Sequence, residues 1–337
     1  MLRELVTIPL SWLYALGVSV RHALFDRHLL PSSSVEVPTI CVGNLSAGGT
    51  GKTPMVEYLL RLLLSRGLHP AVLSRGYKRS TSGFVMANST STIETIGDEA
   101  MQVHRAFPDV PVAVCESRVR GVKQLKRQVE KLDVVLLDDA MQHRALRSGL
   151  TILLTPYDHL YIDDHMLPWG MLRDLPSRAL KADIIVVTKC PDTIRPIDMR
   201  VVDNRLHLPT YQQLHFAGTE YAPMEQEGTP LVLCGIAQPQ YMLEYVRTLY
   251  PLAELMAYPD HYHYKPRDID DIMVRSQNFD FVLTTEKDIQ RLRTTPLVER
   301  LREQGKRIIA LPIRIRFYTP HEAFDNHILN YVREAKR

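Results

Sequence analysis

Short runs of consecutive apolar, often β-branched residues recur through the first 190 residues of the chain, with longer stretches between them. The runs lie at 39–42, 71–73, 112–115, 134–137, 151–154 and 184–187. Continuous apolar runs of this length are typical of parallel strands that are buried on both faces. The intervening stretches include helices predicted at 55–66 and 118–131. This alternation predicts an α/β fold with a doubly wound, mostly parallel sheet.

Beyond residue 200 the pattern changes twice. Residues 201–221 alternate between polar and apolar positions, which favours an extended linker of one or two strands. Apolar runs at 231–233, 281–284 and 308–313 then predict a second, smaller α/β unit. A chain of 337 residues is long enough for two domains. We therefore expect an N-terminal helix over 1–30, a core domain over 31–205, a linker over 206–222 and a smaller domain over 223–337.

The first thirty residues contain an apolar run that is too short to span a membrane. No charged residue occurs over 6–20, a run shorter than the roughly 18–20 residues that a spanning helix needs. One side of a helical wheel carries Leu2, Leu5, Val6, Leu10, Trp12, Leu13, Leu16, Val20 and Leu24. The other side carries Arg3, Glu4, Thr7, Ser11, Arg21, His22 and Asp26. This amphipathic helix suits either a membrane interface or ordinary packing on its own domain.

Composition narrows the classes of protein further. Hydrophobic residues make up 45% and charged residues 23%, which excludes a disordered chain and a polytopic membrane protein. The 41 Lys and Arg nearly balance the 38 Asp and Glu, so we expect no nucleic-acid partner. The four cysteines have no metal-binding spacing and lie in or beside apolar runs. They are predicted to be reduced, buried thiols of a protein on the cytoplasmic side, and a monomer is favoured.

The strongest local motif directly follows the first predicted strand. Its residues are Ser46, Ala47, Gly48, Gly49, Thr50, Gly51, Lys52 and Thr53, which depart from GxxxxGK[ST] only at Ser46. Glycines let backbone N–H groups approach phosphate oxygens, and the N-terminus of the following helix adds partial positive charge. Lys52 would neutralise the β- and γ-phosphates, and the Thr53 hydroxyl would bind Mg²⁺. The motif therefore predicts a nucleoside triphosphate site.

A pair of carboxylates ends the strand predicted at 134–137. In enzymes with this kind of phosphate loop, an aspartate at such a strand end binds Mg²⁺. Ligands also bind beyond the carboxyl ends of strands in open α/β sheets. We assign Asp138 to the metal and Asp139 to catalysis. The alternative for Asp139 is an N-cap of a helix beginning at Ala140.

Seven blocks of residues together resemble the tetraacyldisaccharide 4′-kinase family, the lipid A 4′-kinases of Gram-negative bacteria. The phosphate loop with its flanks, 44–54, is the first block. The others are Ser74-Arg75-Gly76-Tyr77, Gly97-Asp98-Glu99, the segment 138–144, Leu167-Pro168-Trp169-Gly170, Asp260-His261 and Thr285-Glu286-Lys287-Asp288. They occur in the family's order and span most of the chain.

The resemblance implies an ATP- and Mg²⁺-dependent kinase of lipid A biosynthesis. Such an enzyme transfers the γ-phosphoryl group to the 4′-hydroxyl of a tetraacylated disaccharide 1-phosphate, and the product is lipid IVA. It implies that the N-terminal helix attaches the protein peripherally to the cytoplasmic face of the inner membrane. It also implies that the smaller domain closes over the active site.

The same resemblance makes Asp98 the catalytic base and His261 its partner. From the residues alone, Asp98 is equally well explained as the N-cap of a helix over 99–106. His261 lies in an aromatic and histidine cluster that would also suit a packed loop. Lys52 completes the expected catalytic set with Asp139.

Residues that we expect to contact the acceptor substrate follow the predicted strands. Arginine suits the bidentate recognition of phosphate. The candidates are Arg75, Arg79, Arg118, Gln142 and His143.

Two other functions compete with the lipid kinase. A nucleotide-dependent switch or metallochaperone-type NTPase shares the loop and the strand-end aspartate. Guanine recognition would need Asp where Pro191 stands in Thr188-Lys189-Cys190-Pro191-Asp192, which counts against GTP. A soluble small-molecule kinase would leave the amphipathic N-terminus without an explanation.

Overall fold

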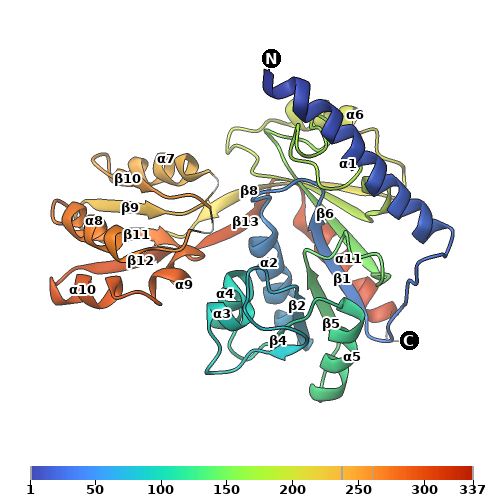
Figure 1. Cartoon of the computed structure of the whole chain (residues 1–337), viewed down its shortest axis with the longest axis horizontal. Helices are drawn as coiled ribbons and strands as arrows, with labels where there is room; N and C mark the ends of the chain where they lie inside the picture. Colours follow the sequence, from blue (N-terminus) through green and yellow to red (C-terminus); the bar gives the residue numbers. More distant parts are fainter. Residues whose placement is uncertain (1, 237, 261, 336–337) are drawn as a thin grey trace.

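The computed structural model describes residues 2–236, 238–260 and 262–335. Within them the chain forms two sheets, one of nine strands and one of four. Figure 1 shows two units side by side, with β8 and β13 running between them. The expected α/β fold with a second, smaller unit is confirmed.

The large sheet has the strand order β13-β8-β7-β6-β1-β5-β2-β4-β3. All pairs from β8 to β4 are parallel, whereas the outer strands β13 and β3 pair antiparallel. Its strands are β1 (Thr39–Asn44), β2 (Pro70–Ser74), β3 (Val85–Met86), β4 (Val112–Val114), β5 (Val134–Asp138), β6 (Leu150–Pro156), β7 (Ile184–Thr188), β8 (Gln213–Tyr221) and β13 (Ile313–Phe317). The runs expected at 39–42, 71–73, 112–115, 134–137, 151–154 and 184–187 are thus all strands.

Helices cover both faces of this sheet because successive residues of each buried strand point to opposite sides. Ile40 and Val42 of β1 pack with α2 (Lys52–Ser65), α4 (Asp98–Ala106) and α11 (His321–Glu334). Cys41, between them, packs on the face that α5 (Arg118–Gln128) covers. The short α3 (Ile93–Ile96) joins the first face, and α6 (Pro196–Leu206) and the 3₁₀ helix η1 (Pro176–Lys181) join the second. The four cysteines are free and buried.

The small sheet is wholly parallel, in the order β10-β9-β11-β12. Its strands are β9 (Pro230–Cys234), β10 (Glu254–Ala257), β11 (Phe281–Thr285) and β12 (Arg307–Leu311). One face packs on α7 (Pro239–Leu249), and the other packs on α8 (Pro266–Ser276), α9 (Asp288–Leu292) and α10 (Leu297–Glu303). The unit therefore has a hydrophobic core on each side of its sheet.

The course of the chain between the units differs from the expected boundaries. Residues 196–206 form α6, which begins at a proline, and 213–221 form β8, which pairs with both β7 and β13. The run expected at 308–313 divides into β12 of the small sheet and the start of β13 of the large one. Helix α11 then buries Phe324 and Ile328 in the large unit. The last part of the expected domain 223–337 thus returns to the core domain, because its apolar face packs there.

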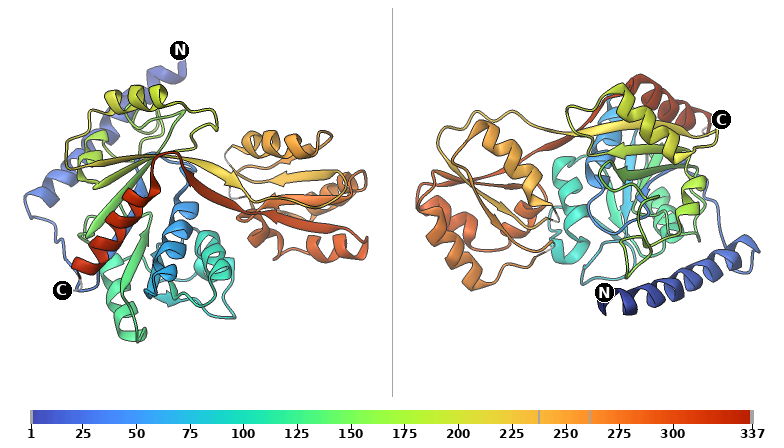
Figure 2. Two further views of the ribbon diagram at one scale, coloured as in Figure 1. Left: turned by 180° about the vertical axis from the view of Figure 1, so that it is seen from behind. Right: turned by 90° about the horizontal axis from the view of Figure 1, so that it is seen from above.

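Helix α1 (Leu2–Asp26) packs on the large unit with its polar side. Ser11 and His22 are buried, although both fall on the polar side of the helix. Leu5, Trp12 and Leu16 on the apolar side are 73%, 69% and 60% exposed. Figure 2 shows α1 along the outside of the large unit. The helix therefore packs on its own domain, as the second interpretation expects, and leaves an apolar side exposed, as the first one expects. Among the described residues, no helix is long and apolar enough to cross a membrane.

Candidate active site

The phosphate loop lies between β1 and α2, as the sequence predicts. Gly48 and Gly51 have φ angles of 105° and 90°, in the region that only glycine adopts at little cost. The Thr188 hydroxyl at the end of β7 donates to the Thr50 carbonyl oxygen at 2.9 Å and so fixes the middle of the loop. Ser46, at the position where the motif has glycine, is buried and pairs with Leu172. The loop therefore opens toward the N-terminus of α2, where a phosphate group gains most from the helix dipole.

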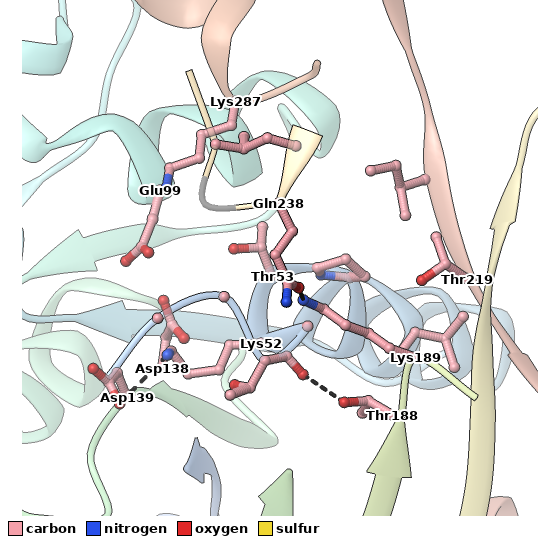
Figure 3. A pocket seen from close by; sticks show the side chains of 18 of the residues that line it. Lys52, Thr53, Glu99, Asp138, Asp139, Thr188, Lys189, Thr219, Gln238 and Lys287 are labelled. Atoms are coloured by element: carbon pink, nitrogen blue, oxygen red, sulfur yellow. Dashed lines mark hydrogen bonds and ion pairs between the residues drawn. The ribbon is translucent and has the colours of Figure 1, made fainter. Parts of the chain in front are cut away.

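Lys52 extends from this loop toward the acidic pair (Figure 3). Its ammonium group donates to Asn44 Oδ1 at 3.3 Å and lies 3.9 Å from Asp139 Oδ1. Asn44, the last residue of β1, is buried. The amine thus lies between the loop and the carboxyl end of β5, where a bound triphosphate needs positive charge.

Asp138 has the features of a cation ligand. It is buried at the end of β5, and its Oδ1 atom has no hydrogen-bond partner among the described residues. Burial, followed by the charges of Glu99 and Asp139, raises its pKa to about 7. A divalent cation would offset this repulsion and satisfy the unpaired oxygen, and Thr53 lines the same cavity. Asp138 and Thr53 therefore fit the magnesium site that the sequence predicts.

Asp139 is held in place by Arg173. The guanidinium group donates from Nη1 to Asp139 Oδ2 at 2.8 Å, and Nη2 contacts Oδ1. Burial acts to raise the pKa of Asp139, but the bonds from Arg173 and the charge of Lys52 hold it below its usual value. No helix follows within 139–149, so Asp139 has no helix to cap. The structure thus contradicts the capping alternative.

Arg118 lies beneath the acidic pair and is 2% exposed. Its guanidinium nitrogens donate to the carbonyl oxygens of Cys115 at 2.9 Å and Asp138 at 3.2 Å. The latter contact supports the backbone next to Asp139, whose φ angle is 50°. Arg118 therefore shapes the metal end of the site, and its expected contact with substrate stays a prediction.

Gln142 and His143 lie on the turn that follows the acidic pair. The Gln142 amide donates to the Asn44 carbonyl oxygen at 2.7 Å. His143 Nε2 accepts the Arg118 backbone N–H at 3.3 Å, which needs an unprotonated nitrogen. Burial, followed by the charge of Arg118, lowers the pKa of His143 to about 4. Both side chains stabilise the turn and also line the cavity.

A cavity of about 1760 Å³ joins the phosphate loop to the smaller unit. Tyr14, Val18 and Arg21 of α1 line one end of it, and Glu286 and Lys287 line the end formed by the smaller unit. Lys189, after β7, donates to Gln238 Oε1 at 2.5 Å and connects the two units (Figure 3). The site thus takes residues from both units and from the N-terminal helix.

The predicted basic residues have different positions. Arg75 lines the cavity beside the phosphate loop. The guanidinium group of Arg79 contacts Glu116 and donates to the Gly83 carbonyl oxygen at 2.6 Å. Arg79 is not among the described residues that line the cavity. Of these two arginines, Arg75 is the better placed for a phosphate group of the acceptor.

Comparisons with known proteins agree over almost the whole chain. The family model of the tetraacyldisaccharide-1-phosphate 4′-kinases, LpxK, matches residues 3–333. The chain belongs to this family. Tetraacyldisaccharide 4′-kinases of Bacteroides thetaiotaomicron and Flavobacterium johnsoniae are each 42% identical to the chain. The two alignments each cover 98% of this chain, and they cover 93% and 97% of the two relatives. The crystal structure of LpxK from Aquifex aeolicus with ATP has a TM-score of 0.75 at 26% identity, covering 98% and 100% of the two chains.

Asp98, to which the resemblance gives the base role, lies where the two units of this 4′-kinase meet. Asp98 is the first residue of α4, and Gly97 is the N-cap. Its carboxylate accepts the Glu99 backbone N–H at 3.1 Å and forms an ion pair with Arg291 of α9. His261 lies outside the described residues. The pairing of Asp98 with His261 therefore stays a prediction.

Reasoning from the sequence missed three members of the kinase site. Arg173 binds Asp139, Asn44 contacts both Lys52 and Arg173, and Glu99 faces the acidic pair. Glu99 is next to Asp98 in a block that already pointed to the site. Arg173 follows Leu167-Pro168-Trp169-Gly170, but its spacing gives no sign that it reaches Asp139.

Asp192 after β7, at the near miss of a guanine motif, accepts a hydrogen bond from the Tyr318 hydroxyl at 2.7 Å. That contact ties the end of β7 to the segment after β13. The family comparison does not favour the switch-type alternative.

Proposed function

We propose that the chain transfers the γ-phosphoryl group of ATP to the 4′-hydroxyl of a tetraacylated disaccharide 1-phosphate. The observation that carries this proposal is the single cavity that joins the phosphate loop, the acidic pair and the inner edge of α1. A family match over residues 3–333 supplies the substrate class. The product carries phosphate at both ends of the disaccharide and is lipid IVA.

The nucleotide half of the reaction rests on the phosphate loop. Lys52 neutralises the triphosphate, and the N-terminus of α2 faces its oxygens. Asp138 and Thr53 hold Mg²⁺, which supplies charge neutralisation of the phosphate oxygens. Arg173 fixes the Asp139 carboxylate so that it stays ionised beside Lys52. These groups position the γ-phosphorus for attack and stabilise the charge that develops.

The acceptor half of the reaction is assigned to the start of α4, where Glu99 lines the cavity and Asp98, which is not among its described lining residues, lies next to Glu99. Asp98 takes the proton of the 4′-hydroxyl as the oxygen attacks, and His261 assists it. Arg75 lines the cavity and carries the charge that a phosphate group of the acceptor needs. Loss of the base is expected to lower turnover and leave ATP binding intact.

The exposed side of α1 is assigned to the cytoplasmic face of the inner membrane. Leu5, Trp12 and Leu16 present apolar surface that packing on the domain leaves uncovered. Arg21 of α1 lines the cavity, so the same helix borders both the membrane and the site. An acylated substrate could then keep its chains at the interface while its sugar enters the cavity.

A radiolabel assay tests this function directly. Purified chain is incubated with γ-³²P-ATP, Mg²⁺ and detergent-dispersed disaccharide 1-phosphate, and lipids are separated from inorganic phosphate. Label in a lipid that disappears with Lys52→Ala supports the proposal. Release of labelled inorganic phosphate without a labelled lipid would contradict the acceptor and favour the switch-type NTPase.

A further inference from the structure

Arg291, on α9 of the smaller unit, is a buried cation that contacts the larger unit. Its side chain is 4% exposed, and the Asp98 side chain that it meets is 9% exposed. The guanidinium Nη2 contacts Asp98 Oδ2 across the contact between α4 and α9. The other terminal nitrogen, Nη1, donates to Asp288 Oδ1 at 3.1 Å. Arg291 therefore bridges a carboxylate of its own helix and one of the other unit.

Asp288 is itself fixed by the ends of two strands of the small sheet. Its Oδ2 atom accepts the Gly235 backbone N–H at 2.8 Å and the Thr285 hydroxyl at 2.8 Å. Gly235 follows β9, and Thr285 is the last residue of β11. The carboxylate that orients Arg291 thus has little freedom of its own. A cation held in this way loses little further entropy when it binds Asp98.

We propose that Arg291 is a positioning residue for the transfer reaction. It keeps the Asp98 carboxylate ionised and fixes its orientation from the side of the smaller unit. This inference rests on the proposed function, in which Asp98 is the base. An adjacent cation stabilises the ionised carboxylate, and a two-point hold limits the orientations of that group. The larger unit therefore has a complete acceptor site only while α9 is docked on α4.

A purely structural clamp between the units would give the same static picture, so the test must separate the two roles. The same helix pair offers a matched control in the contact between the Arg105 guanidinium of α4 and the Gln290 side chain of α9. Neither Arg105 nor Arg291 is among the described residues that line the cavity, so neither substitution removes a group from the cavity wall. Substituting Arg105 weakens docking of the units without touching Asp98.

The experiment is a double-mutant cycle on kcat, with Arg291→Met, Asp98→Ala and both together, in the full chain. We expect Arg291→Met to lower kcat by about 10- to 100-fold with the KM for ATP within about twofold. Combined with Asp98→Ala, it should lower kcat by less than about twofold further, because it acts through Asp98. Arg105→Met should stay within about threefold of the wild type. Arg291→Lys, which keeps the charge, should recover part of the lost rate.

Other outcomes overturn the inference. Equal losses from Arg291→Met in both backgrounds would show that Arg291 does not act through Asp98. Equal losses from Arg291→Met and Arg105→Met would show a structural clamp between the units. If Arg291→Met does not fold by circular dichroism, Arg291→Lys takes its place in the cycle, with the same criterion of non-additivity. A wild type that labels no lipid would reject the proposed function. A wild type that labels lipid with an additive cycle would reject only the role of Arg291.

Discussion

His22 of α1 and Asp174 of the loop after β6 meet with Nε2 and Oδ1 2.5 Å apart. Their side chains are 6% and 2% exposed. Asp174 directly follows Arg173, which binds Asp139 at the acidic pair. Tyr14 of the same helix donates to the Arg173 carbonyl oxygen at 3.1 Å. The N-terminal helix is therefore joined by polar contacts to the segment that orients a catalytic carboxylate.

We predict that His22→Ala destabilises the fold by about 3 kcal/mol, since it removes the imidazole partner of the buried Asp174 carboxylate. Urea unfolding of the purified chain measures the change. Trp12→Ser, at a position 69% exposed, is the control and should stay within about 0.5 kcal/mol of the wild type. Equal stability of His22→Ala and the wild type would show that this contact does not hold α1 on the domain.

Membrane attachment should be separable from stability on the same helix. Replacing Leu5, Trp12 and Leu16 together by Ser removes exposed apolar surface, and each loss is worth roughly 1.5–3 kcal/mol of burial in a membrane. We expect binding to phospholipid vesicles to fall at least ~100-fold in a sedimentation assay. The urea midpoint should not change.

The matched control for this triple variant is Leu252→Ser, which replaces a residue 76% exposed on the smaller unit. Its vesicle binding should equal that of the wild type. Deleting residues 1–30 is a poorer test, because it also removes Ser11 and His22 from their buried positions. Undiminished binding of the triple variant would reject the assignment of α1 to the membrane.

The parts of the fold that the sequence predicts well are those set by consecutive residues. A phosphate loop needs its glycines, Lys52 and Thr53 side by side in the chain, so one short segment reveals it. Each strand of the parallel core is likewise a continuous apolar run, because both faces of the sheet are covered. Asp138 and Asp139 follow one such run, and so their place at the sheet edge was also predictable.

What the sequence leaves open depends on contacts between distant segments. Arg173 reaches Asp139 from a loop 34 positions away, and Arg291 reaches Asp98 from 193 positions away. The hydrophobic periodicity of the surrounding sequence does not predict either contact. Helix α6 was not predicted because the polar and apolar alternation assigned to 201–221 includes its last residues. Its start at Pro196 does carry the ordinary signal of a helix N-terminus. The return of α11 to the large unit depends on β13 pairing with β8.

We expect Lys52→Ala to abolish measurable transfer, with a loss of at least about 10²–10³-fold in kcat, because phosphate charge would be left uncompensated at the loop. The radiolabel assay measures it. Lys123→Ala, on the exposed side of α5, removes a charge of the same kind outside the cavity and should be indistinguishable from the wild type. A Lys52→Ala enzyme of full activity would reject the assignment of the phosphate loop.

Asp138 should make stability without nucleotide depend on pH. Its pKa is raised from 3.8 to about 7 in the folded chain, so between these values the folded state holds a proton that the unfolded state has released. Stability contributed by this group therefore falls as pH rises from about 4 to 7. Asp138→Asn removes the titration, so its urea midpoint relative to the wild type should rise between pH 5 and pH 8.

Magnesium should reverse that trend, because a cation binds the ionised form of Asp138 and must displace its proton. We predict that the apparent affinity for Mg²⁺–ATP in the wild type increases as pH rises toward 7 and then levels off. In Asp138→Asn, the affinity should be weaker and flatter over the same range. Isothermal titration at several pH values measures both. A wild-type affinity independent of pH, with Asp138→Asn equally tight, would remove Asp138 from the metal site and leave its unpaired oxygen to another partner.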